Sequence, residues 1–238
     1  MDNINWVVLD VDGVLIDVSE SYDLAVKRTA EKLLNRMGYE YSVSPEEIRE
    51  FRKRGQFGDD YKVTEGLVIT SIVEDGEKLI EIFPKGEDIN WLRKETGKEI
   101  GEETIEPIFD RLYFEGDDIS GENGLWKREK PLVDTSLLKE VSDRYALGYV
   151  TGRSREEVDL ASQILDFQLS NVVTREDFLK PDHRALTSLV GEENGIYAGD
   201  TYNDHLLVKN FNRKTDGEFI FVLIDQENPI NTVLKELL

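Results

Sequence analysis

The chain has 238 residues and a net charge of −21, and hydrophobic residues make up 39 per cent of it. This length and apolar content suffice for one large domain or for a core with an inserted second module. The negative charge argues against a nucleic-acid partner, because phosphate backbones attract lysine and arginine, and against adhesion to anionic lipid. The absence of cysteine excludes disulfides, thiolate catalysis and zinc–thiolate sites.

The first residues show neither the basic nor the apolar region of a signal peptide. No apolar run approaches the ~20 residues of a membrane-spanning helix. We therefore expect a soluble, cytoplasmic protein with no membrane partner.

The first predicted element is a strand over residues 6–9, a continuous apolar run typical of a strand buried on both faces of a parallel sheet. It ends abruptly in the polar segment 10–13. A helix is expected over 21–37. A second helix is expected from Ser44, because Glu47 three residues later completes a capping box.

The next segments are less regular. Residues 62–83 stay ambiguous, since their β-branched residues compete with a helical spacing. Helices are expected over 88–96 and 102–113. The segment 116–131 carries several glycines in a polar run and is expected to be a connecting loop.

After residue 131 predicted helices and short apolar strands alternate. The helices are expected over 136–145, 154–165, 182–190, 203–209 and 231–238, and the strands over 147–150, 171–174, 196–198 and 219–224. This alternation predicts an α/β fold with a doubly wound, mostly parallel sheet.

The first strand has no strand partner for over a hundred residues, and an insertion explains this economically. We therefore expect a catalytic α/β core made of residues 1–17 and 126–238, and an inserted, mainly helical cap made of residues 18–125.

Ligands of open α/β sheets bind at the carboxyl ends of the strands. The side chains that follow the predicted strands are therefore the candidates for a site: Asp10, Asp12, Thr151, Gly152, Arg153, Lys180, Asp200 and Asp204.

Carboxylates that gather at one edge of a sheet repel one another unless a cation joins them. Hard oxygen ligands in small number suit Mg²⁺, which shares its remaining sites with phosphate. A carboxylate such as Asp10 can attack phosphorus, and Lys180 and Thr151 would neutralise or bind the phosphoryl oxygens. Asp12, two residues further on, can protonate the leaving oxygen and later accept a proton from water.

Four motifs in this order resemble those of the haloacid dehalogenase-like superfamily: residues 10–14 (DVDGV), 151–153 (TGR), 180–181 (KP) and 199–204 (GDTYND). The place of the insertion, between the first and second motifs, resembles the subgroup with a helical cap, as in phosphoglycolate phosphatases. Four motifs in order are far more specific than a single short one.

The resemblance implies roles for individual residues. Asp10 would be the nucleophile. Mg²⁺ would be bound by Asp10, the backbone carbonyl of Asp12 and Asp200, and Asp204 would orient a metal-bound water or Lys180. Thr151 and Lys180 would bind the transferring phosphate.

The sequence leaves two interpretations open for each of two arginines. Arg153 either grips the substrate or pairs with one of the nearby acids. Arg54, within the basic segment 52–56, either contacts the substrate from the cap or lies on a solvated basic face at a helix end.

The prediction is a Mg²⁺-dependent phosphatase that acts on a small phosphorylated metabolite through an aspartyl-phosphate. A sugar phosphomutase on the same scaffold and a non-catalytic, receiver-like phospho-acceptor module are the alternatives. The sequence identifies neither the substrate nor the oligomeric state.

Overall fold

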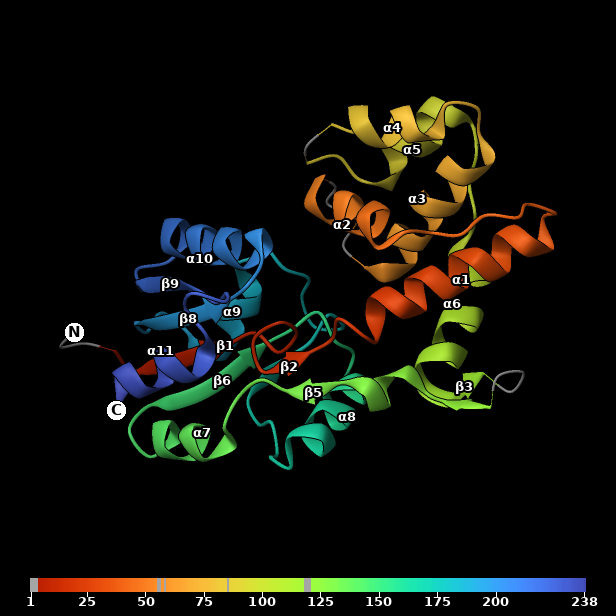
Figure 1. The fold of residues 1–238 in the computed structure, drawn as a ribbon. Helices are drawn as coiled ribbons and strands as arrows, with labels where there is room; N and C mark the ends of the chain where they lie inside the picture. Colours follow the sequence, from red (N-terminus) through yellow and green to blue (C-terminus); the bar gives the residue numbers. More distant parts are fainter. Residues whose placement is uncertain (1–3, 55–56, 58, 85, 118–120) are drawn as a thin grey trace. The chain divides into compact units, whose positions relative to one another are not determined.

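The computed structural model describes residues 4–238, apart from residues 55–56, 58, 85 and 118–120 (Figure 1). The chain forms two compact units. The first contains Met1–Val18 and Glu129–Leu238, and the second contains Ser19–Arg128. The second unit is thus an insertion in the chain of the first.

A five-stranded sheet organises the first unit, in the order β7-β6-β1-β8-β9, and all neighbouring strands run parallel (Figure 1). The strands are β1 (Trp6–Leu9), β6 (Ala146–Val150), β7 (Val172–Val173), β8 (Gly195–Gly199) and β9 (Phe219–Leu223). Val7, Val8 and Leu9 of the central strand β1 are fully buried, as expected for a strand covered on both faces.

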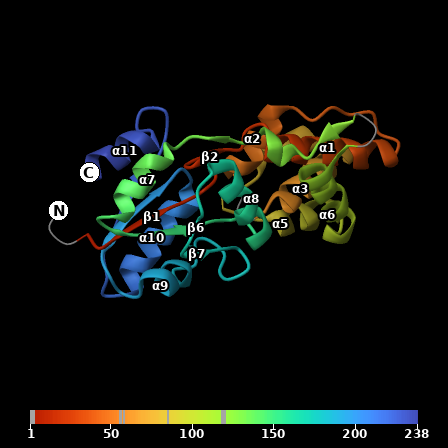
Figure 2. The same ribbon diagram turned by 90° about the horizontal axis from the view of Figure 1, so that it is seen from below.

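Helices cover both faces of this sheet. They are α7 (Thr135–Ser142), α8 (Arg155–Leu165), α9 (Arg184–Val190), α10 (Tyr202–Lys214) and α11 (Ile230–Leu237). Val7 and Leu9 pack with α7, α8 and α11, whereas Val8 packs with α9 and α10. Figure 2 shows α7 and α11 on one side of β1 and α9 and α10 on the other. The prediction of a doubly wound, mostly parallel α/β core is confirmed.

Helix α10 is longer than predicted. It was expected to end at residue 209 but continues to Lys214. Polar residues dominate its last turns, yet Phe211 is fully buried against Phe219 and fixes this end of the helix on the sheet.

A two-stranded ladder lies where the chain leaves and re-enters the first unit. Strand β2 (Ile16–Asp17) pairs antiparallel with β5 (Lys130–Pro131). The two ends of the insertion are therefore tied to each other by backbone pairing.

The second unit is mainly helical, as expected. Its elements are α1 (Tyr22–Arg36), α2 (Pro45–Arg54), α3 (Asp60–Ile72), α4 (Gly76–Ile82), α5 (Ile89–Thr96), α6 (Glu102–Asp110), a π-helical segment η1 (Arg111–Glu115), strands β3 (Gly116–Asp117) and β4 (Glu122–Asn123), and a 3₁₀ turn η2 (Leu125–Arg128). The predicted capping box of α2 is present, since the side chains of Ser44 and Glu47 accept each other's backbone N–H.

Helix α3 explains why the sequence was ambiguous over residues 62–83. Residues 63–70 are all buried, because α1, α2, α4, α5 and α6 surround this helix. A helix buried on all sides has no polar face, so its sequence shows no helical periodicity. In the described part of the chain, no helix combines the length and the apolarity needed to cross a membrane.

The prediction of a connecting loop over 116–131 was wrong, because β3, β4, η2 and β5 all fall in it. Leu125 is buried and the indole N–H of Trp126 donates to the Phe114 carbonyl over 3.2 Å. A Cβ at Gly124 would lie 2.2 Å from that same carbonyl oxygen, so this glycine is required by a close approach of two chain segments rather than by a flexible loop.

Candidate active site

The ends of three neighbouring strands bring the candidate residues together. Asp10 follows β1, Thr151 follows β6 and Asp200 follows β8, and β1 lies between the other two strands. The backbone N–H of Asp10 donates to the Ala198 carbonyl over 2.9 Å, and this bond fixes the segment that follows β1 against β8. This edge is where open α/β sheets bind ligands.

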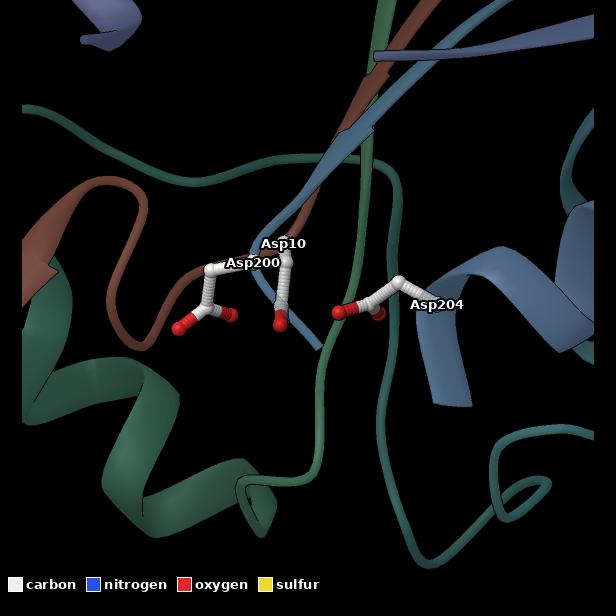
Figure 3. Close-up of side chains that lie close together, drawn as sticks. All are labelled: Asp10, Asp200 and Asp204. Carbon is white, nitrogen blue, oxygen red and sulfur yellow. The ribbon is translucent and has the colours of Figure 1, made fainter. Parts of the chain in front are cut away.

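Three carboxylates form the centre of the site. One oxygen from each of Asp10, Asp200 and Asp204 lies within 4.8 Å of the others. Figure 3 shows Asp10 between the other two, with the Asp204 carboxylate directed toward it. Asp10 and Asp204 are buried and Asp200 is exposed.

Lys180 joins two of these acids. Its Nζ lies 2.8 Å from Oδ2 of Asp10 and 2.7 Å from Oδ1 of Asp204, and its side chain is only 12 per cent exposed. Sequence reasoning placed Lys180 on the same edge, in the segment between β7 and α9. Three carboxylates and one ammonium leave a formal charge of −2 in this cluster.

The pKa shifts reflect this crowding. Burial, followed by the charge of Asp204, raises the pKa of the Asp10 carboxyl well above its ordinary value, and Lys180 partly offsets both effects. Although Asp200 keeps surface exposure, the protein around its carboxyl removes part of the hydration, and this loss of hydration together with the charge of Asp204 raises the pKa of Asp200 to about 6. Both shifts indicate that the cluster favours additional positive charge.

Lys180 and Asp204 stabilise each other's charged form. Burial opposes the charge of Lys180, but Asp10 and Asp204 raise the pKa of its ammonium above the ordinary value. Burial also opposes the ionisation of Asp204, yet Lys180 and the hydrogen bonds from Thr201 lower its pKa. This pair is therefore charged.

Asp204 also caps a helix. Its carboxylate accepts the backbone N–H of Thr201 over 3.0 Å, and its own N–H donates to the Thr201 hydroxyl, which forms the capping box of α10. The hydroxyl of Tyr197 lies 2.9 Å from Oδ1 of Asp204. Sequence reasoning missed Tyr197, although a tyrosine within a buried apolar strand needs a partner for its hydroxyl.

Gly13 permits the close approach of the first loop to Asp200. Its φ is +72°, and a Cβ at this position would lie 2.1 Å from Oδ2 of Asp200. Both the left-handed backbone and the contact require glycine here.

The Asp12 carboxylate forms an ion pair with Arg153. Its Oδ1 lies 2.7 Å from Nε and 2.6 Å from Nη2 of Arg153. The metal role predicted for Asp12 concerns its backbone carbonyl and stays a prediction.

Arg153 is fully buried and makes a second ion pair, in which its Nη2 lies 2.7 Å from Oε2 of the buried Glu129. Of the two interpretations of Arg153, the structure shows the ion pair and gives the substrate grip no support. Sequence reasoning missed Glu129, because nothing in the segment around it distinguishes it from the many other acids of the chain.

The remaining candidates lie at the sheet edge or outside the described side chains. Thr151 is buried, and its hydroxyl accepts the backbone N–H of Arg153 over 3.2 Å. Gly152 is exposed, with open space where a Cβ would be. Arg54 is the last residue of α2, but its side chain, like that of Lys53, lies outside the described part of the structure, as do residues 55 and 56.

In the second unit, Arg52 of the basic segment is already paired. Its guanidinium lies 3.0 Å from Asp23 and 2.6 Å from Asp60.

An open parallel α/β core with three acids and a lysine at its carboxyl edge, and a helical insertion after its first strand, defines a phosphoryl-transfer type of hydrolase. No protein-family model matches the sequence, and no curated protein matches it. Among solved structures, Phosphatase Tt82 from Thermococcus thioreducens is 44 per cent identical, with a TM-score of 0.85 over 98 per cent of both chains.

More distant structures share the fold. A protein of Haemophilus somnus, described as a predicted phosphoglycolate phosphatase, matches all of both chains at 15 per cent identity and a TM-score of 0.57. A haloacid dehalogenase-like hydrolase of Bacteroides fragilis matches 94 per cent of this chain and 99 per cent of its own at 14 per cent identity and a TM-score of 0.52. The chain belongs to the same family as Phosphatase Tt82 and is a phosphatase, as the four motifs predicted. It shares its fold with the haloacid dehalogenase-like hydrolase of Bacteroides fragilis.

Proposed function

We propose that the protein is a Mg²⁺-dependent phosphomonoesterase that acts on a small phosphorylated metabolite through an aspartyl-phosphate on Asp10. The observation that carries this proposal is the cluster of Asp10, Asp200 and Asp204, in which the two buried acids, Asp10 and Asp204, both contact Lys180. A phosphatase that leaves its phosphoryl acceptor as a buried carboxylate must supply compensating positive charge beside it.

The donor set fits Mg²⁺. All three side chains offer hard carboxylate oxygens, which this cation prefers, and its two charges would balance the formal −2 of the cluster. Asp10, Asp200 and the backbone carbonyl of Asp12 would hold the ion, with Asp204 beside it. When bound, the ion would stabilise negative charge on the phosphoryl oxygens.

Asp10 and Asp12 divide the chemistry in this proposal. A carboxylate oxygen of Asp10 forms a bond to phosphorus while the ester P–O bond breaks, and Asp12 gives its proton to the departing oxygen. In the second step a water oxygen attacks phosphorus, Asp12 accepts the water proton, and the acyl-phosphate bond breaks to regenerate Asp10. Lys180 and Thr151 bind the phosphoryl group and offset its charge.

The inserted unit is the proposed cap, which would select the organic part of the substrate. Its position in the chain between β1 and β6 supports this role, as does the ladder of β2 and β5 that ties its two ends.

The test is release of inorganic phosphate from phosphoglycolate, a sugar phosphate, a nucleotide and an amino-alcohol phosphate, each with Mg²⁺ and with EDTA. We expect release only with the metal and a clear preference for one ester. Asp10→Asn is the matched control, since it keeps the size of the side chain and removes the nucleophile. Equal turnover by this variant, or full activity in EDTA, would contradict the proposal.

A further inference from the structure

A buried ion-pair network lies behind the proposed acid–base residue. The guanidinium of Arg153 is 0 per cent exposed and is held between Oδ1 of Asp12 and Oε2 of Glu129. Its Nη1 also donates to the backbone carbonyl of Glu157 over 3.2 Å. Protein groups thus contact every nitrogen of the guanidinium.

Such a network contributes little to stability by itself. Removing two charges from water costs several kcal/mol per ion, and an apolar replacement is often as stable. A buried guanidinium whose nitrogens are all in contact does orient the carboxylate it binds, because its planar fork of donors has a fixed geometry. The Asp12 carboxylate depends on such a partner for its orientation more than that of Asp10 does. Asp12 lies on the turn after the strand, and its side chain is 28 per cent exposed.

We propose that Arg153, anchored by Glu129, is the positioning residue of Asp12 and orients its proton toward the leaving group. The inference rests on the proposed acid role of Asp12. Both guanidinium contacts reach Oδ1. The transferable proton is therefore carried on Oδ2 and moves from there to the ester oxygen, which takes the electron pair of the breaking P–O bond.

A dependence on the leaving group separates positioning from a merely structural role. An alkyl phosphate needs its leaving oxygen protonated, whereas the nitrophenolate of p-nitrophenyl phosphate leaves without a proton. The value to compare is kcat/KM, because it ends with departure of the leaving group and excludes the later hydrolysis that both esters share. A smaller active fraction lowers both values equally, so the ratio of the two esters is insensitive to partial unfolding.

The variants are Arg153→Lys, which keeps the charge and loses the fork, and the double variant Arg153→Met/Glu129→Gln, which leaves no buried charge without a partner. We expect kcat/KM for the alkyl ester to fall roughly 10–100-fold. This is less than the full contribution of general acid catalysis, about 10²–10⁴-fold, because the acid is misdirected and not removed. For p-nitrophenyl phosphate we expect a fall of less than about 3-fold, since that reaction draws little on the acid.

Arg175→Lys is the matched control. Arg175 binds the buried carboxylate of Glu157 over 2.7 Å and donates to the Gly152 carbonyl over 3.1 Å. The same substitution there should leave the ratio of the two esters as in the wild type.

Asp12→Asn separates a failure of the acid role of Asp12 from a failure of the positioning role of Arg153. If Asp12→Asn lowers kcat/KM equally for the two esters, the acid role of Asp12 is wrong, and the positioning role of Arg153 is wrong with it. If Asp12→Asn is selective for the alkyl ester but the Arg153 variants are not, the positioning role alone is overturned. Selectivity in both supports the proposal.

Discussion

Replacement of Lys180 by methionine tests whether its ammonium compensates the buried acids. Methionine has a similar length and no charge, so Lys180→Met leaves Asp10 and Asp204 without the cation that lies 2.8 and 2.7 Å from them. Breaking a buried ion pair by removal of one partner costs about 3–5 kcal/mol. For a chain of this size each kcal/mol corresponds to roughly 2–4 °C, so we expect Tm to fall by roughly 6–20 °C.

The measurement is thermal unfolding followed by circular dichroism in EDTA, since a bound divalent cation would replace part of the missing charge. Lys139→Met is the control, because Lys139 is an exposed residue of α7. Its Tm should change by no more than about 1–2 °C, as for other surface substitutions. An unchanged Tm for Lys180→Met would refute the view that Lys180 neutralises the cluster.

Three further outcomes follow from the site. Asp10→Asn should lower turnover by about 10⁴-fold or more, measured as phosphate release, while its circular dichroism spectrum stays that of the wild type. Gly13→Ala should weaken Mg²⁺ binding roughly 10–100-fold in titration calorimetry, because the added Cβ would lie 2.1 Å from Oδ2 of Asp200 and displace it. Unaltered affinity would show that the Asp200 carboxylate is not a ligand. In EDTA, Asp200 should raise the free energy of unfolding as the pH falls from about 7 to about 5. Its pKa of about 6 in the folded protein exceeds the unfolded value of about 3.9, so the folded state binds more protons in this range. Asp200→Asn should remove this part of the pH dependence of Tm, and saturating Mg²⁺ should suppress it.

Sequence reasoning was most effective where strand ends determine position. The segments after β1, β6 and β8 had to converge because parallel neighbouring strands end at the same edge of a sheet. That rule alone places Asp10 and Asp200 together, and the structure brings their carboxylates within reach of one ion.

The rule gives no information on which direction a side chain on a turn takes. Asp12 and Arg153 are 141 residues apart in sequence and Glu129 is 24 residues from Arg153, so neither pair leaves a periodic signal. The same holds for α3, where burial on every side removes the polar face that would have marked it as a helix.

The two proposed catalytic acids obtain their positions by different means. Asp10 directly follows the fully buried strand β1, and its backbone N–H is bonded to Ala198 of the neighbouring strand, so the sheet itself places the nucleophile. Asp12 lies beyond that support, on a turn that needs a left-handed Gly13, and its carboxylate is directed by a side chain rather than by the backbone. A cavity under β1, such as Val8→Ala, should therefore lower stability by about 2–4 kcal/mol and act on all phosphate esters alike. Selectivity between leaving groups should arise only where the ion pair of Asp12 is changed.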